Sequence, residues 1–338
     1  MDSFAGMRSR VVAIADEGWR AFDRGSGLDT ARVGSPRLPN RINVGLLNAS
    51  GLREAARFRP DVVLSGHMVC SPAAAALRRL TRVPYVQYVY AEELSATPGL
   101  ARFAMQHAHT TIAISRYTQE LAERIGTPQR MELVLPGVDL PATVERGSAD
   151  RPTILTIASL FRRYKGHDVM IRALPLIKAR VPDVEWVVVG SGPLEPLYRS
   201  MVSNRRLDDH VRFCGWVTAE ERDLWLDAAQ VFAMPSRLGS GGGGGEGFGI
   251  VYLEAGAHQV PVVAGNVAGA LDAVVDGETG ILVDPTDHVQ VAGALADLLL
   301  DSERAARMGE AGARWAADHA WAKVSARVEE ILLAAVRG

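Results

Sequence analysis

Two glutamates frame a glycine-containing segment, EGFGIVYLE at residues 246–254, which follows an apolar run at 231–234. If a helix begins near Gly249, its first amides and the positive end of its dipole form a seat for a diphosphate. Glu254 then lies about 7 Å further along the helix axis, within reach of ribose hydroxyls, and Glu246 can accept hydrogen bonds from sugar hydroxyls. The alternative is one acid that complements the helix dipole and a second that is only solvated. We interpret the segment as a candidate site for a sugar carried on a nucleoside diphosphate.

A basic loop containing Arg162, Arg163 and Lys165 follows a second apolar run at 153–158. A nucleoside diphosphate gains negative charge as its bond to the sugar breaks, so cations placed beforehand stabilise the transition state. Lysine is rare in this arginine-rich chain, which makes a lysine in a loop notable. No Asp-x-Asp ends an apolar strand to hold a divalent metal, so we expect protein cations to replace Mg²⁺, with no metal site and no cofactor. A solvated basic loop without a function is the alternative.

Short runs rich in β-branched residues alternate with longer segments of helical character, which predicts parallel sheets built from βαβ units. The runs lie at 10–15, 61–65, 85–90, 111–114 and 132–135, and then at 153–158, 185–189, 211–213, 231–234, 262–264 and 281–283. Residues 136–151 are rich in Pro, Gly and polar side chains, as an interdomain linker is. The sequence therefore predicts an α/β protein of two doubly wound, Rossmann-like domains at 1–145 and 146–320. An amphipathic terminal helix at 321–338 could cross back to the first domain.

Two glycine-rich stretches need separate interpretation. Gly190-Ser-Gly192 follows a buried strand, but Glu195 stands where a dinucleotide fingerprint needs its third glycine, so NAD binding is disfavoured. Residues 239–245 are glycines and one serine, and such a stretch does not hold one conformation by itself. A plain tether and a mobile active-site loop both fit it.

Composition narrows the class of partner. The 338 residues carry a formal net charge of −2, which gives no general attraction for nucleic acid or an anionic membrane, so a phosphate site must be local. Cys70 and Cys214 are far apart and lack CxxC spacing, which suits reduced thiols. No stretch approaches about 18 apolar residues, and residues 1–18 are not built like a signal peptide. We expect a cytoplasmic bacterial protein; peripheral binding at the inner face of the membrane and homo-oligomerisation stay open.

Several ordered motifs resemble the retaining glycosyltransferases of family 4, which adopt the GT-B fold of two Rossmann-like domains facing a cleft. Besides EGFGIVYLE they are PGVD at 136–139, YKGHD at 164–168, VVVGSGPL at 187–194, RFCGWV at 212–217, MPSR at 234–237 and DGETGILVDP at 276–285. The resemblance covers the second half of the chain strongly and the first half loosely.

The resemblance implies roles for the residues of the second domain. It places Glu246 on the donor sugar and Glu254 on the ribose. The diphosphate would meet the backbone of four consecutive residues, Phe248, Gly249, Ile250 and Val251.

Three further contacts with the donor are implied. Lys165 would bind the leaving diphosphate, with Arg162 or Arg163 as the paired arginine, because the usual arginine position is taken by Leu160. The turn at Gly190 would lie beside the nucleotide. The backbone of Trp216 and Val217 would meet the base.

The first domain departs from the family pattern at two places. The strand at 85–90 lacks the histidine that relatives carry at its end; His67 could line the same cleft, or could be a structural hydrogen-bonding group. The sequence also opens at what looks like the family's second βα unit, so either its start omits the first unit with the Gly-Gly loop or the first domain is reduced. We expect the chain to bind UDP or GDP and to transfer sugar slowly or not at all. In the second domain, relatives carry a glycine pair near the donor sugar. Here the corresponding segment is 265–272, which still contains Gly265 and Gly269, so it is a mild variation.

These observations predict hexosyl transfer with retention of configuration from a UDP- or GDP-sugar to a glycan, lipid or small-molecule acceptor. In the mechanism proposed for the family, the leaving phosphate oxygen itself takes the acceptor proton, so no protein base is needed. A nucleotide-sugar 2-epimerase of the same fold and a non-catalytic nucleotide-binding protein are the alternatives.

Overall fold

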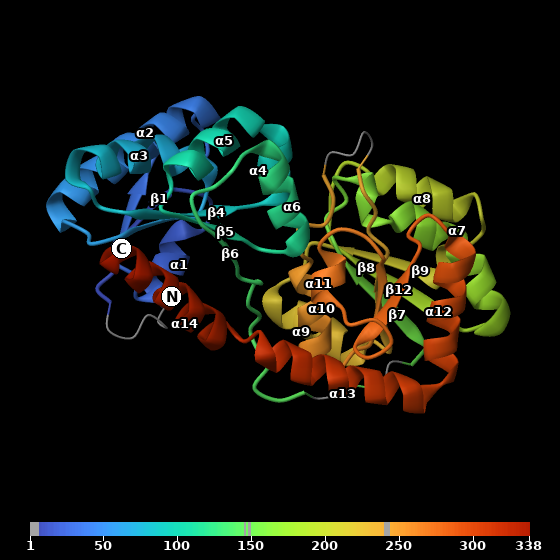
Figure 1. The fold of residues 1–338 in the computed structure, drawn as a ribbon. Coiled ribbons are helices and arrows are strands. Elements are labelled where there is room, and N and C mark those ends of the chain that lie inside the picture. Colours follow the sequence, from blue (N-terminus) through green and yellow to red (C-terminus); the bar gives the residue numbers. More distant parts are fainter. Residues whose placement is uncertain (1–6, 145–146, 148–149, 240–243) are drawn as a thin grey trace. The chain divides into compact units, whose positions relative to one another are not determined.

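The second half of the chain contains one parallel sheet of six strands. In the computed structural model, which describes residues 7–144, 147, 150–239 and 244–338, the strand order is β12-β11-β10-β7-β8-β9 (Figure 1). The strands are β7 (Thr153–Ile157), β8 (Glu185–Val189), β9 (Val211–Gly215), β10 (Val231–Met234), β11 (Val262–Gly265) and β12 (Gly280–Val283). The order reverses between β7 and β10. In open sheets of this type, ligands bind beyond the carboxyl ends of the strands at that switch point.

Helices cover both faces of this sheet, as a parallel sheet requires. They are α7 (His167–Arg180), α8 (Glu195–Ser203), α9 (Ala219–Ala228), α10 (Ile250–Ala257), α11 (Ala270–Ala273), α12 (His288–Leu300) and α13 (Ser302–Asp318), with short 3₁₀ turns η2 (Arg163–Lys165) and η3 (Asp208–His210). Helix α7 packs on α12, and α10 packs on α13. Gly256 of α10 lies directly against Gly312 of α13, where a side chain would not fit.

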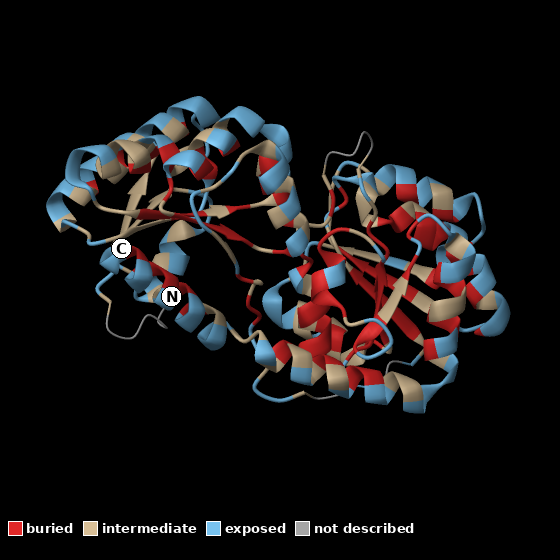
Figure 2. Ribbon diagram, viewed as in Figure 1, coloured by how far each residue is buried: buried red, intermediate tan, exposed pale blue. Residues whose placement is uncertain are grey.

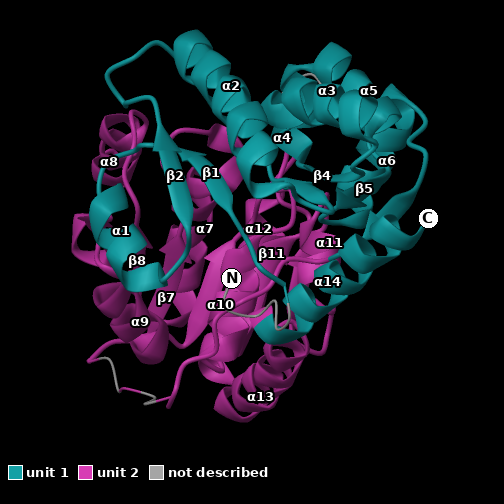
Figure 3. Cartoon of the chain, turned by 90° about the vertical axis from the view of Figure 1, so that its left-hand side faces the viewer, with its two compact units in different colours: residues 1–134, 322–338 teal, residues 135–321 magenta. Residues whose placement is uncertain are grey.

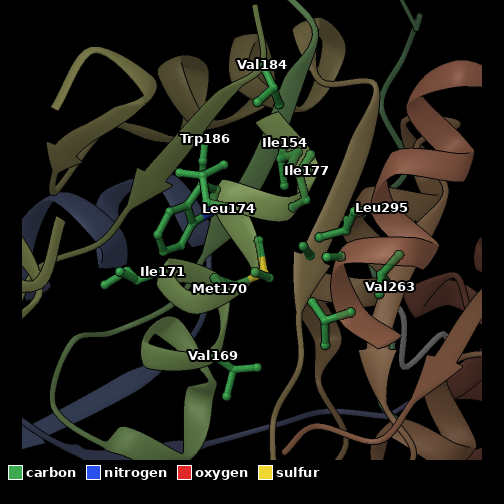
Figure 4. Packing of buried hydrophobic residues seen from close by; sticks show 14 of the residues in the cluster. Ile154, Val169, Met170, Ile171, Leu174, Ile177, Val184, Trp186, Val263 and Leu295 are labelled. Atoms are coloured by element: carbon green, nitrogen blue, oxygen red, sulfur yellow. The ribbon is translucent and has the colours of Figure 1, made fainter. Parts of the chain in front are cut away.

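The strands of this unit and parts of the helices that cover them are buried (Figure 2). The largest fully buried side chain is Trp186 of β8 (Figure 4). Its indole lies among apolar side chains of α7 and the sheet, including Leu174, Ile177 and Ile154. The indole nitrogen Nε1 donates to Thr156 Oγ1 at 2.9 Å. The only polar atom of this large side chain is therefore satisfied inside the core.

The first half of the chain contains two smaller parallel sheets. Strands β1 (Val11–Ile14) and β2 (Thr30–Val33) pair with each other, and β3 (Val63–Ser65), β4 (Tyr85–Val89), β5 (Thr110–Ala113) and β6 (Met131–Leu133) form a separate sheet in that order. The helices are α1 (Trp19–Ser26), α2 (Asn40–Phe58), α3 (Ser71–Thr81), α4 (Ala91–Ala96), α5 (Pro98–His107) and α6 (Arg116–Ile125), with the turn η1 (Met68–Cys70). Helix α2 follows β2 and packs on β1, where buried Glu54 binds Arg10 at 2.9 Å.

The terminal helix α14 (Trp321–Arg337) packs on the first half of the chain. Val328, Ile331 and Leu332 join a buried cluster with Val86 and Ile112. The chain therefore divides into unit 1, residues 1–134 and 322–338, and unit 2, residues 135–321 (Figure 3).

The segment after β6 belongs to unit 2 in this division, so the boundary lies nearer the N-terminus than residue 145. Val138 forms an isolated bridge with Ala320, and Gly137 packs beneath Trp321. These contacts hold residues 135–138 on unit 2.

Parallel sheets covered by helices confirm the predicted α/β class. No helix in the described part of the chain combines the length and the apolar character that crossing a membrane requires.

Candidate functional site

Lys165 and Glu246 meet at the switch point of the sheet in unit 2. Lys165 lies in the loop after β7 and Glu246 in the loop after β10, and Lys165 Nζ contacts Glu246 Oε2. The side chains are 15% and 14% exposed. The structure thus brings together the two residues that the sequence predicts for the diphosphate and the donor sugar; their roles stay predictions.

The turn that presents Lys165 depends on a glycine. Gly166 has φ of 85°, and a side chain there would collide with the carbonyl of Pro235. Lys165 also lies over the ring of Tyr164, 5.3 Å from its centre. Arg162 and Arg163, the candidates for the paired arginine, are exposed on the same loop.

A bidentate ion pair braces the two loops. Arg237, after β10, donates from both terminal nitrogens to the carboxylate of Asp168 at 2.9 Å each, and its amide donates to the Tyr164 carbonyl at 2.8 Å. Planar, bidentate pairs of this kind fix geometry as well as adding energy. Sequence reasoning placed both residues in motifs but did not predict that they pair.

The predicted diphosphate seat is the start of α10. The helix begins at Ile250, one residue after the expected Gly249, whose φ of 92° makes the sharp entry and whose missing side chain leaves room for the ring of Tyr252. Like any helix, α10 leaves its first amides without intrahelical partners. Phe248 is buried beneath this turn and Val251 lies in the first turn. The contact of a diphosphate with the amides of residues 248–251 stays a prediction.

The backbone of Glu246 is held in place by the glycine-bearing segment after β11. Gly269 donates its amide to the Glu246 carbonyl at 2.9 Å. A side chain at Gly269 would collide with the carbonyl of Gly247. This close approach explains why the segment keeps a glycine at residue 269. Of the glycine tract at 239–245, residues 240–243 lie outside the described residues.

Glu254, the predicted ribose ligand, lies on the side of α10 that faces α9. Its Oε1 accepts from Arg222 Nη1 at 3.3 Å. Burial raises the pKa of the Glu254 carboxyl, and the charge of Arg222 acts against that rise. A small cavity of about 80 Å³ opens beside the pair, lined also by Asp139, Asp223 and His258. Arg222 carried no signal in the sequence, because its neighbour comes from another helix.

The two predicted base-side elements also adjoin. Gly190 donates its amide to the Gly215 carbonyl at 2.8 Å, and its φ of 135° and its contact with the Ala158 carbonyl leave no room for a side chain. Trp216, directly after Gly215, is 87% exposed, and Val217 is half-buried. Their contacts with a base stay predictions.

His67 of unit 1 is paired with a carboxylate that sequence reasoning did not connect with it. Its Nδ1 lies 2.7 Å from Glu93 Oε1 and 3.2 Å from the Val69 amide, so it also caps η1. Burial raises the pKa of Glu93 to about 7 and lowers that of His67. Burial therefore favours the uncharged forms of both groups at the carboxyl ends of β3 and β4.

Unit 1 also has a cavity of about 610 Å³ beyond the carboxyl ends of β1 and β2. Arg20, Arg24 and Arg37 line it together with Trp19. Asp16 and Glu17 lie on its rim, so the excess of positive charge is small.

A doubly wound parallel sheet with Lys165 and Glu246 in contact at its switch point, together with a second unit of parallel sheets, is the architecture of the GT-B class. The family model described as "Glycosyl transferases group 1" matches residues 144–315, and that of "Glycosyltransferase Family 4" matches residues 4–141. The chain belongs to this glycosyltransferase family.

Two relatives illustrate the family. The chain is 42% identical, over 65% of its length, to the GDP-mannose-dependent alpha-(1-6)-phosphatidylinositol monomannoside mannosyltransferase of Mycolicibacterium smegmatis, and spans 60% of that protein. It is 31% identical, over 89% of its length, to the D-inositol 3-phosphate glycosyltransferase of Pseudarthrobacter chlorophenolicus, and spans 78% of it.

Solved structures share the fold at low identity. HepE of Anabaena, in complex with UDP and glucose, matches with a TM-score of 0.78 at 19% identity, covering 96% of this chain and 92% of that one. Sucrose-phosphate synthase from Thermosynechococcus elongatus matches with a TM-score of 0.76 at 19% identity, covering 96% and 98%. These matches support the GT-B architecture.

Proposed function

We propose that this protein transfers mannose from GDP-mannose, with retention of configuration and without a metal ion, to an acceptor that contains a phosphorylated inositol. The contact of Lys165 with Glu246 at the switch point, beside the start of α10, is the observation that carries the proposal. It brings together one cation and one carboxylate, next to the N-terminus of a helix, at the place where this type of sheet binds ligands.

In the proposed mechanism the ribose hydroxyls bind Glu254, and the diphosphate lies against the amides of residues 248–251. The sugar hydroxyls take the place of Lys165 on Glu246, and Lys165 turns to the diphosphate. As the bond between sugar and phosphate breaks, Lys165 and the amides stabilise the charge that forms on the phosphate. The leaving phosphate oxygen accepts the proton of the attacking hydroxyl on the same face of the sugar, which retains the configuration.

The donor and acceptor in this proposal come from the relatives. The mannosyltransferases are named as GDP-mannose-dependent, and both groups of relatives are named for an inositol that bears phosphate. The cavity lined by Arg20, Arg24 and Arg37 suits the phosphate of such an acceptor.

Incubation with GDP-mannose or UDP-glucose, each with inositol 3-phosphate, phosphatidylinositol mannoside or no acceptor, tests the proposal. We expect a mannosylated product only with GDP-mannose and one of the two acceptors. Release of free epimerised sugar would instead indicate a 2-epimerase. Nucleotide binding without any turnover would indicate a non-catalytic protein.

Turnover should be the same in EDTA as in Mg²⁺. The proposed site uses the charge of Lys165 in place of a metal ion. Rates measured on metal-stripped protein, with and without added Mg²⁺, check this. A strict requirement for Mg²⁺ would contradict the site as proposed.

Glu254→Gln should weaken GDP binding by about 1 to 3 kcal/mol, because an ionised acceptor of two hydroxyls becomes an amide with half the accepting capacity. Calorimetric titration with GDP measures the loss. Glu185→Gln is the matched control and should leave GDP affinity unchanged. Glu185 is also largely buried and paired with an arginine, Arg212, but it lies at the amino end of β8, away from the carboxyl ends of the strands where the nucleotide is proposed to bind. Equal GDP affinities for the wild type and both variants would contradict the assignment of the ribose to Glu254.

A further inference from the structure

Arg222 of α9 is held so that one edge of its guanidinium faces Glu254 of α10. Nε and Nη2 donate to Asp223 Oδ1 at 3.1 and 3.0 Å, and Nη1 donates to Glu254 Oε1 at 3.3 Å. The neighbouring aspartate thus fixes the guanidinium, and the remaining nitrogen reaches across the small cavity to the carboxylate. A carboxylate has about four lone-pair positions, so this contact leaves Glu254 most of its accepting capacity.

The surroundings of Glu254 make a cation necessary for its charge. The side chain is 25% exposed, and the carboxylates of Asp223 and Asp139 face it from α9 and from the segment after β6. Burial and both aspartates raise the pKa of Glu254, whereas Arg222 and His258 lower it.

The other neighbours of Glu254 cannot replace Arg222. His258 Nδ1 lies 2.7 Å from Asp227 Oδ1, so this imidazole is engaged with another carboxylate. Helix α13 packs on the part of α10 that carries Gly256, two residues on and therefore about 200° around the helix from Glu254. Arg222 is the group that balances the carboxylates around this glutamate.

We propose that Arg222 is a positioning residue for nucleotide binding: by holding Oε1 it keeps Glu254 ionised and aimed, so that the carboxylate can accept both ribose hydroxyls of the donor. This inference rests on the proposed function, since it assigns Glu254 to the ribose. Arg222 lies outside the family motifs quoted above, and its hydrogen bond to Glu254 connects α9 with α10.

Calorimetric titration of GDP into the full chain and into Arg222→Gln, between about pH 5.5 and about pH 8, tests the inference. We expect Arg222→Gln to bind about tenfold more weakly near pH 5.5, the effect of one hydrogen bond to a charged group. The deficit should shrink as the pH rises, because a higher pH favours the ionised form of Glu254 even without Arg222. The phosphate of GDP titrates equally in both experiments. The ratio of the two affinities therefore reports only the protonation of protein groups. Arg222→Lys keeps the positive charge, so the ratio of wild-type to variant GDP affinity should depend much less on pH.

Two controls separate positioning from a general structural effect. Arg180→Gln breaks a half-exposed ion pair with Asp297 between α7 and α12 and should leave GDP affinity unchanged at every pH. In a Glu254→Gln background, Arg222→Gln should cause no further loss, because no carboxylate remains to hold.

A pH profile for Arg222→Gln parallel to the wild type, or an additive loss in the Glu254→Gln background, would overturn the role of Arg222 while leaving the proposed function intact. Failure of the wild type to bind any nucleoside diphosphate would overturn both.

Discussion

Replacing Lys165 by alanine should lower kcat for sugar transfer by about 10²- to 10³-fold, while KM for the donor should change little. In the proposed mechanism the ground-state diphosphate also lies against the amides at the start of α10, so we expect donor binding to survive the substitution. The same mechanism assigns the charge that appears as the sugar leaves to the ammonium group of Lys165 at the switch point, where it contacts Glu246 in the structure. Its loss is therefore felt mainly in the transition state.

Steady-state kinetics with saturating acceptor measure this effect. Lys178→Ala is the matched control, since Lys178 lies in the last turn of α7 and should leave kcat unchanged. Lys165→Arg keeps the charge and should recover part of the rate. A Lys165→Ala protein with wild-type kcat would exclude this lysine from the mechanism.

Trp186→Ala should lower the free energy of unfolding of unit 2 by about 3 to 5 kcal/mol. The indole is fully buried among α7 and sheet residues, and its removal leaves a large cavity. It also takes away the donor to Thr156, whose own hydroxyl remains bonded to the Ala233 carbonyl at 2.5 Å. Loss of packing is therefore the main cost.

Urea unfolding followed by circular dichroism checks this prediction. Trp216→Ala makes the same substitution at an 87% exposed position and should change stability by no more than about 0.5 kcal/mol. Trp186→Phe keeps most of the volume and should fall between the two. Equal midpoints for Trp186→Ala and Trp216→Ala would refute the account of the core.

The sheets could be predicted largely from local patterns. Strands at 185–189 and 231–234 have the expected bounds, because continuous apolar runs are local signals. The strand Thr30–Val33 was not predicted, because it has only four residues and Arg32 interrupts its apolar pattern. In the structure the Arg32 side chain pairs with Asp23.

The contacts within the site could not be predicted in the same way. Lys165 and Glu246, Asp168 and Arg237, and Arg222 and Glu254 are each far apart in the sequence. They meet because β7 and β10 are neighbours at the reversal of strand order and because α9 packs beside α10. Residue types could suggest which groups bind a donor, but only the order of the strands decides which of them touch.

A crystal structure of the protein with GDP, grown without divalent cations, tests the central claim most directly. We predict the diphosphate against the amides of residues 248–251 with Lys165 turned from Glu246 to a phosphate oxygen, and the ribose hydroxyls on Glu254. A nucleotide bound elsewhere, or bound at this place only through a metal ion with Lys165 still on Glu246, would contradict the account.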